Sequence, residues 1–194
     1  MIQFVMSYLN GTRYHLLFTI IRGIHSFVVS TLRGERSIHM KLNIVKGTVD
    51  YIKDCEEALL YSELGRRYFS SEGSARRALE EGFLRQEIYV SLDSEHQCTG
   101  FLWVIQNGIF HSFPYLHIIA VKESYRNMGI GKVMMQFFED LCFRSHSKVF
   151  LVVADFNPQA KKFYQELGYT EIGSIPDLYR AGIDEFLMMK TRPN

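Results

Sequence analysis

The chain has 194 residues, of which 47% are hydrophobic and 22% are charged, and its formal net charge is +1. This length suits one domain with a substantial core. A charge so near zero gives no electrostatic reason to expect nucleic acid or a membrane surface as a partner. Cys55, Cys98 and Cys142 match neither a zinc-ligand spacing nor a disulfide framework. We therefore expect no metal, and reduced, buried thiols in a cytoplasmic protein.

The first 39 residues differ from the rest in composition. They contain four arginines and a single acidic residue, Glu35, and their apolar run at 16–32 is interrupted by Arg22 and Gly23. That run is short for a membrane-spanning helix, which needs about 20 apolar residues. A secretory signal carries its charge before its apolar core rather than inside it. We expect an extension of unknown role at 1–39, with a targeting peptide, an interfacial helix or an upstream start before Met40 as alternatives.

From Met40 onward, hydrophobic periodicity predicts strands and helices in a consistent order. A strand at 41–46 leads to a helix capped by Thr48 or Asp50, and a second helix follows Ser71 or Ser74. Three strands come next, and the polar residues 93–96 between the first two indicate a hairpin. The predicted bounds of these strands are 87–92, 99–105 and 115–121.

The second half alternates between strands and helices. A predicted helix at 131–144 carries apolar residues at i, i+3, i+4 and i+7, and the apolar run 148–154 is typical of a buried strand. Asn157 and Pro158 then mark the start of a helix that ends at Gly168. Strands are predicted at 169–173 and 184–190. This order favours a mixed α/β sheet covered on both faces.

A glycine turn, Arg126-Asn-Met-Gly129-Ile-Gly131, joins the third strand of that group to the helix at 131–144. We expect the amides of Met128 to Lys132 to lack intrahelical partners, so that with the helix dipole they form an anion site. Without a Cβ, Gly129 and Gly131 allow close approach to a pyrophosphate and a positive φ. The spacing matches neither the P-loop nor the dinucleotide fingerprint, which disfavours those two classes of nucleotide site.

A second motif begins at the next helix with Asn157-Pro-Gln-Ala160-Lys-Lys-Phe163-Tyr164 and ends at Gly168-Tyr. Ala160, Phe163, Tyr164 and Leu167 fall on one helical face, and Phe163 and Leu167 are expected in the core. Tyr164 is different, because a phenol beside a sheet can keep its hydroxyl in a polar cleft.

Together, these two motifs resemble the signatures of the GCN5-related N-acetyltransferases (the GNAT superfamily), and the resemblance covers roughly residues 41–190. It implies an N-acetyltransferase domain at 40–194 after the extension at 1–39. It also implies an α/β fold with a mixed, mostly antiparallel central sheet, helices on both faces, and a V-shaped splay between the parallel strands at 116–121 and 148–154. Acetyl-CoA would lie in the V as co-substrate.

The resemblance further implies which residues contact acetyl-CoA. The pantetheine arm pairs with the backbone of Ile119 and Val121 as an added strand, and the pyrophosphate lies on the amides of 126–132. The complete expected set is Ile119, Ala120, Val121, Arg126, Asn127, Met128, Gly129, Ile130, Gly131, Lys132, Asn157 and Tyr164. Lys161 or Lys162 could reach the 3′-phosphate, although solvated lysines are the favoured interpretation.

Acetyl transfer to a primary amine needs a base and an acid. The resemblance assigns the acid to Tyr164, which protonates the leaving thiolate, and makes His117 the best candidate for the base. A hydrogen-bonded structural histidine is an equal alternative for His117, and Glu87, Asp155 and Glu185 are further candidate bases. A noncatalytic CoA-binding or interaction module on the same fold is the rival hypothesis.

The sequence is compatible with several acceptor amines: a small molecule or polyamine, a protein N-terminus and a lysine all fit. Phe110, Phe113, Tyr115 and Tyr179 suggest an aromatic mouth, although core packing explains each of them singly. A homodimer paired through the closing strands is one option for assembly.

Overall fold

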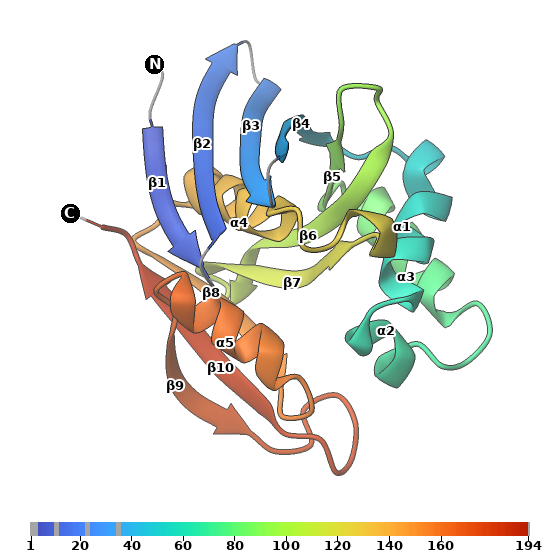
Figure 1. Cartoon of the computed structure of the whole chain (residues 1–194). Coiled ribbons are helices and arrows are strands. Elements are labelled where there is room, and N and C mark those ends of the chain that lie inside the picture. The colour runs from blue at the N-terminus through green and yellow to red at the C-terminus, as the bar shows by residue number, and fades with distance from the viewer. Residues whose placement is uncertain (1–3, 10–11, 22–23, 34–35, 194) are drawn as a thin grey trace.

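The computed structural model describes the backbone of residues 4–9, 12–21, 24–33 and 36–193, and the side chains of residues 41–193. Within these residues the strands form one sheet, in the order β1-β2-β3-β4-β5-β6-β7-β8-β10-β9. Neighbouring strands are antiparallel except for the parallel pair β7 and β8. The strand bounds are β1 Phe4–Leu9, β2 Thr12–Ile21, β3 Ile24–Arg33, β4 Arg36–Lys46, β5 Ile88–Leu92, β6 Cys98–Ile109, β7 Phe113–Val121, β8 Lys148–Ala154, β9 Thr170–Ile175 and β10 Glu185–Thr191 (Figure 1).

The helices cover both faces of this sheet. Their bounds are η1 Val49–Tyr51, α1 Ile52–Leu60, α2 Glu63–Tyr68, α3 Ser74–Leu84, η2 Glu123–Tyr125, α4 Ile130–Cys142 and α5 Pro158–Glu166. On β6, Leu102 belongs to a core with α4, whereas the next residue, Trp103, belongs to a second core with α1 and α3. This alternation is the period of two that places successive strand side chains on opposite faces. Both faces of the central strands are therefore buried.

The parallel pair β7 and β8 separates along its length. The two strands pair only at Tyr115 with Phe150 and at Leu116 with Leu151. Beyond these residues β7 continues to Val121 and β8 to Ala154 without further pairing between them. The expected V-shaped splay is thus present, and its open end faces the glycine turn.

Most predicted elements from residue 41 onward agree with the structure to within a few residues, and β8 agrees at both ends. Two features were not predicted. The short helix α2 lies where no element was expected, and β1, β2 and β3 add antiparallel strands within the expected extension, in place of the interfacial helix that we considered. β4 crosses the expected boundary between residues 39 and 40.

The three cysteines are free and buried, as expected. Among the helices in the described part of the chain, none has the length and apolarity needed to cross a membrane.

Candidate active site

A cavity of about 940 Å³ lies at the open end of the splay. Its walls come from α2, β7, the glycine turn, the start of α4, the end of β8, and α5. Most of the expected acetyl-CoA residues line it: Ile119, Val121, Arg126, Asn127, Gly129, Ile130, Gly131, Lys132, Asn157 and Tyr164. Ala120 and Met128 do not. The side chain of Ala120 belongs to the core with α1 and α3, because it points to the opposite face from its neighbours on β7.

The backbone of β7 presents its polar groups to this cavity at alternate residues. The Lys122 amide donates to the Thr99 carbonyl of the neighbouring strand at 2.9 Å, so the even-numbered residues of this segment bond to β6. The polar groups of Ile119 and Val121 consequently face away from β6. They lie beyond the last residue pair with β8, so their amides have no strand partner among the described residues.

The glycine turn adopts the left-handed backbone that its sequence suggests, but at fewer positions than expected. Gly129 has φ 82° and is the N-cap of α4, and Asn127 has φ 62°. The expectation of positive φ at Gly131 is wrong, because this residue lies inside the first turn of α4. A Cβ added to Gly131 would meet nothing nearer than Phe163 Cζ at 3.7 Å. The fold itself therefore does not require glycine at 131.

The run of unpaired amides is also shifted from the expected one. The Lys132 amide donates to the Gly129 carbonyl at 3.1 Å and the Arg126 amide to the Glu123 carbonyl at 3.2 Å. Both amides are thus removed from the expected anion site. The amides from Asn127 to Gly131 have no acceptor among the described residues. These five groups, at the positive end of the α4 dipole, are suited to bind an oxyanion.

Two lysines add positive charge to this end of the cavity. Lys132 and Lys162 both line it, and partial burial lowers the pKa of Lys132, opposed by the charge of Glu166. Lys161 is directed elsewhere, because its ammonium pairs with Glu171 at 2.7 Å. Of the two lysines considered for a 3′-phosphate, only Lys162 therefore reaches the cavity.

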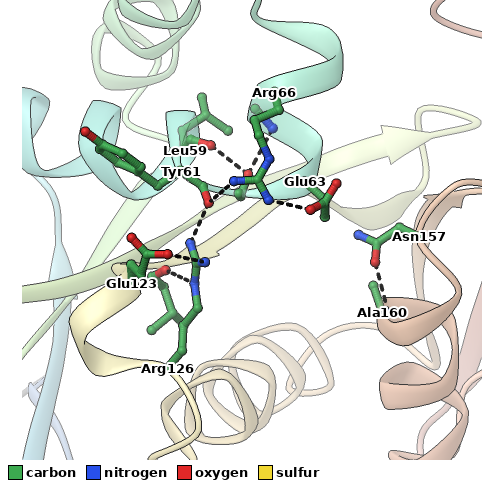
Figure 2. Close-up of polar contacts among 11 residues, drawn as sticks. Leu59, Tyr61, Glu63, Arg66, Glu123, Arg126, Asn157 and Ala160 are labelled. Carbon is green, nitrogen blue, oxygen red and sulfur yellow. Dashed lines mark hydrogen bonds and ion pairs between the residues drawn. The ribbon is translucent and has the colours of Figure 1, made fainter.

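Asn157 caps α5 by accepting from the Ala160 amide at 3.2 Å (Figure 2).

Tyr164 is buried but lines the cavity, and its ring packs against Phe163 and Tyr169. Its hydroxyl makes no hydrogen bond to a described residue. Burial raises its pKa well above the ordinary value, because an ionised phenolate is poorly solvated there. Tyr164 is therefore a protonated donor near neutral pH.

His117 lies on β7, where it lines the cavity. Its ring meets Trp103 edge-on with 4.7 Å between centroids, and lies 5.8 Å from Tyr115. Burial lowers its pKa below the ordinary 6.5, opposed by the charge of Glu87. In the described part of the chain no side chain or carbonyl hydrogen-bonds to the ring. The hydrogen bond of a structural histidine is therefore not seen among the described residues, and the role of His117 as the base stays a prediction.

The end of the cavity opposite the glycine turn contains Glu185, the first residue of β10. Only 2% of its surface is exposed, and its carboxylate accepts a hydrogen bond from the Tyr68 hydroxyl of α2. Burial raises the pKa of Glu185, and the bond from Tyr68 partly offsets this. The other candidate bases do not line the cavity. Glu87 instead accepts from Trp103 Nε1 at 2.8 Å, and Asp155 accepts from the Asp184 amide.

Aromatic rings surround Glu185, although only one of them was expected to line this end. The Tyr179 ring lies 6.0 Å from that of Tyr68, which in turn lies 5.7 Å from that of Phe156. Tyr115 supports the group from behind, with its hydroxyl 2.8 Å from that of Tyr179. Phe110 is 75% exposed outside the cavity. Sequence reasoning missed both Tyr68 and Phe156. Tyr68 belongs to α2, which was not predicted, and Phe156 lies in the short loop between β8 and α5.

Comparison with known proteins identifies the family. The model of the acetyltransferase (GNAT) family matches residues 58–169, which span the splay, the glycine turn and α5. The chain belongs to the GNAT family. The mixed, mostly antiparallel sheet, the splayed parallel pair and the flanking helices are the GNAT fold, so the predicted fold class is confirmed.

Individual relatives are distant. An uncharacterized N-acetyltransferase of Methanocaldococcus jannaschii is 35% identical over 82 residues, which cover 40% of this chain and 53% of that protein. The chain thus spans about half the length of that relative. An aminoglycoside 6'-N-acetyltransferase complexed with coenzyme A is 19% identical with a TM-score of 0.60, covering 78% of this chain and 99% of that one. Naa50 of Arabidopsis thaliana, in complex with the bisubstrate analogue CoA-Ac-MVNAL, is 16% identical with a TM-score of 0.58 and the same coverage. At these identities the structural likeness shows the fold alone.

Proposed function

We propose that this GNAT protein is an N-acetyltransferase that transfers the acetyl group of acetyl-CoA directly to a primary amine. The observation that carries the proposal is one cavity onto which three features open together. These are the unpaired amides of the glycine turn, the unpaired amides of Ile119 and Val121 on β7, and the protonated hydroxyl of Tyr164.

The residues present fit acetyl-CoA as co-substrate. The amides from Asn127 to Gly131 would hold the pyrophosphate, and the Ile119 backbone and the Val121 amide would pair with the pantetheine arm. Lys162 lines the cavity and would be the lysine that reaches a phosphate at its edge. When bound, acetyl-CoA supplies an activated thioester. The relative complexed with coenzyme A has the same fold.

On the acceptor side, the chain has to remove a proton from the amine. A primary amine with a pKa near 10.4 is neutral only about once in a few thousand molecules at pH 7. His117 is our candidate base, because it is neutral and lines the cavity. Glu185 is the second candidate, placed among aromatic rings at the same end.

On the other side of the reaction, Tyr164 donates a proton to the departing thiolate sulfur. A backbone amide of Ile119 or Val121 donates to the thioester oxygen as negative charge develops on it, and one such donor contributes about 3 kcal/mol. No covalent acyl-enzyme is needed, because Cys55, Cys98 and Cys142 are all buried away from the cavity.

The proposed acceptor is a primary amine on a small molecule or polyamine, on a protein N-terminus or on a lysine. Of the structural relatives described above, one is named an aminoglycoside 6'-N-acetyltransferase, and the other, Naa50, is in complex with the bisubstrate analogue CoA-Ac-MVNAL. We also propose a cytoplasmic location, which suits three free cysteines. Homodimer formation through the closing strands stays a prediction.

The test is incubation of the purified chain with acetyl-CoA and a panel of amines, followed by mass spectrometry of the products. The panel contains spermidine, kanamycin, and short peptides with free or blocked N-termini and lysines. We expect one class to gain 42 Da per acetyl group, a mass that follows from the exchange of one hydrogen for one acetyl. Binding of acetyl-CoA without any product would favour the noncatalytic module.

The matched variant is Tyr164→Phe, which keeps the ring and removes only the hydroxyl. Because loss of a general acid costs about 10²–10⁴-fold in rate, turnover should fall by at least about 100-fold while the acetyl-CoA Kd changes less than about threefold. Equal losses of turnover and affinity would contradict the acid role of Tyr164.

A further inference from the structure

The side chain of Arg126, in the glycine turn, is bound to the chain's own backbone. Its Nε donates to the Val121 carbonyl at 3.1 Å and its Nη2 to the Tyr61 carbonyl at 2.9 Å. Glu123 lies 3.9 Å from Nη1. Figure 2 shows the guanidinium between its own turn and the loop that follows α1. The side chain therefore joins two segments that are 65 residues apart in sequence.

Tyr61 is a favourable place for such a contact. It is the C-cap of α1, where terminal carbonyls lack intrahelical donors and the helix dipole is negative. The Tyr61 carbonyl has two lone pairs, and the second donor is Arg66 Nη1 at 3.1 Å. Arg66 belongs to α2, so its bond is local, whereas the bond from Arg126 reaches across to the glycine turn (Figure 2).

The loop held by Arg126 continues directly into α2, which forms one wall of the cavity. Ser62 caps this helix by accepting from the Gly65 amide at 2.9 Å. At its other end, Tyr68 donates to Glu185. Leu64 and Tyr68 line the cavity, and Tyr68 does so beside Glu185, on the side where we place the acceptor. A shift of the Tyr61 carbonyl would therefore move residues of the acceptor wall.

We infer that Arg126 is a positioning residue for the acceptor: its guanidinium ties the phosphate-binding turn to α2 and so sets the wall against which the amine binds. In this arrangement the backbone amides of the turn bind phosphate. The Arg126 side chain supplies the tie, by which we mean its hydrogen bond to the Tyr61 carbonyl. The inference builds on the proposed function, since it assigns the acceptor side to α2.

The experiment compares Arg126→Lys, Arg126→Ala and Arg66→Ala with the wild type. Lysine keeps the charge but lacks the planar fork, so it cannot donate to the Val121 and Tyr61 carbonyls as arginine does. We expect Arg126→Lys to raise the acceptor KM about tenfold, the size expected for loss of a charged hydrogen bond. The acetyl-CoA Kd should change less than about threefold, since charge and amides remain. Arg126→Ala should raise the acceptor KM at least as much.

Arg66→Ala is the matched control, because it removes the other donor to Tyr61 without touching the turn. Its acceptor KM should change less than about threefold. Two results would overturn the inference: a wild-type acceptor KM in Arg126→Lys, or equal increases in Arg66→Ala and Arg126→Ala. An increase confined to the acetyl-CoA Kd would also overturn the inference, because it would show that the guanidinium binds the phosphates of acetyl-CoA.

A readout independent of activity separates this inference from the proposed function. Without any ligand, hydrogen exchange at residues 61–69 should be faster in Arg126→Lys and Arg126→Ala than in the wild type. If the wild type acetylates no amine of the panel, the proposed function fails while the exchange data still decide whether the tie exists. Unchanged exchange in both variants would refute the tie whatever the activity.

Discussion

Gly129 and Gly131 lie two residues apart in one turn, but their backbones make different demands. Gly131 has ordinary helical geometry, and an added Cβ would have room beside Phe163. Gly131→Ala should therefore not lower the melting temperature, because alanine has the higher helix propensity. Its methyl group would occupy the cavity next to the unpaired amides, so we expect the acetyl-CoA Kd to rise at least about tenfold by calorimetry.

Gly129→Ala is the contrasting control. Its φ of 82° is costly for any residue with a Cβ, so this variant should lose about 1–2 kcal/mol of unfolding free energy. If Gly131→Ala destabilises the protein as much as Gly129→Ala does, glycine at 131 serves the fold rather than the ligand.

His117 gives the activity a pH signature. A primary amine acceptor with a pKa near 10.4 makes log(kcat/KM) rise with a slope of about one across neutral pH. A base whose pKa is lowered below 6.5 adds a second unit of slope only at pH values below its own pKa. We therefore expect the slope to change from about two to about one as pH rises through that value, in assays at constant ionic strength.

The variant His117→Ala should lack the break and show a slope of about one throughout, with a rate reduced by at least about 100-fold. A break that persists in His117→Ala would assign the base to another group, and Glu185 is then the first to replace. The same burial affects stability. Because the folded pKa is depressed, the neutral state of His117 supports the fold above pH 6.5, and this support is lost as pH falls through the folded pKa.

At the scale of elements, a helix or strand could be predicted when the signals for it lie in neighbouring residues of the sequence. β8 and α5 were predicted well, because a continuous apolar run and an Asn-Pro start are readable from neighbouring residues alone. α2 was missed because it has six residues and a central glycine. Gly65 lies so close to α1 that an added Cβ would come 1.8 Å from the Leu59 carbonyl oxygen. That reason for glycine exists only in three dimensions.

The candidate site divides in the same way. The cofactor side lies on two contiguous motifs, so its residues could be predicted, although which amides stay unpaired depended on the exact start of α4. The acceptor side is assembled from Tyr68, Phe156, Tyr179 and Glu185, which come from four separate segments. The contact between Tyr68 and Glu185 spans 117 residues, and no local pattern encodes such a pair.

The pair of α4 and β10 offers a stability test. Lys190 of β10 contacts Glu139 of α4 at 2.6 Å, with side-chain exposures of 19% and 8%. Lys190→Met would leave a buried carboxylate without its partner. We expect a loss of about 2–3 kcal/mol in urea unfolding at pH 7, less than for a fully buried pair because Lys190 keeps some solvent.

The loss should depend on pH in a defined direction. Burial already raises the pKa of Glu139, and removal of Lys190 should raise it further. The deficit of Lys190→Met should therefore be small near the unfolded pKa of about 4.5 and grow as pH rises. The control is Arg85→Met, since Arg85 and its partner Glu81 are 58% and 52% exposed; it should cost less than about 1 kcal/mol. Equal losses in both variants would show that the pair of Lys190 and Glu139 is not special.

At the scale of the whole molecule, the extension and the site are separate in sequence. Among the residues whose side chains the structure describes, those that line the cavity lie between Ser62 and Glu185. We therefore propose 40–194 as the acetyltransferase domain, and expect this fragment to bind acetyl-CoA with a Kd within about twofold of the full chain. Loss of binding in the fragment would make residues 1–39 part of the folding unit.

The fragment should differ from the full chain in association. β3 pairs with β4 from His25–Ile44 to Arg33–Arg36, so removing it uncovers a strand edge with free backbone groups. Light scattering should then detect dimers or larger species at concentrations where the full chain is uniform. A monodisperse fragment of unchanged affinity would show that the edge is already protected.

The splay between β7 and β8 divides this sheet into two parts that are joined by a short ladder of hydrogen bonds. Among the described residues, β8, β10 and β9 join the rest of the sheet through two residue pairs of β7 and β8. We expect so narrow a junction to let the two parts of the sheet move relative to each other, which would change the width of the cavity between them. A ligand whose amides hydrogen-bond along Ile119 and Val121 would fill the cavity between the two parts of the sheet and restrain both of them. Stiffening should then spread outward to β9, a strand that the ligand never touches.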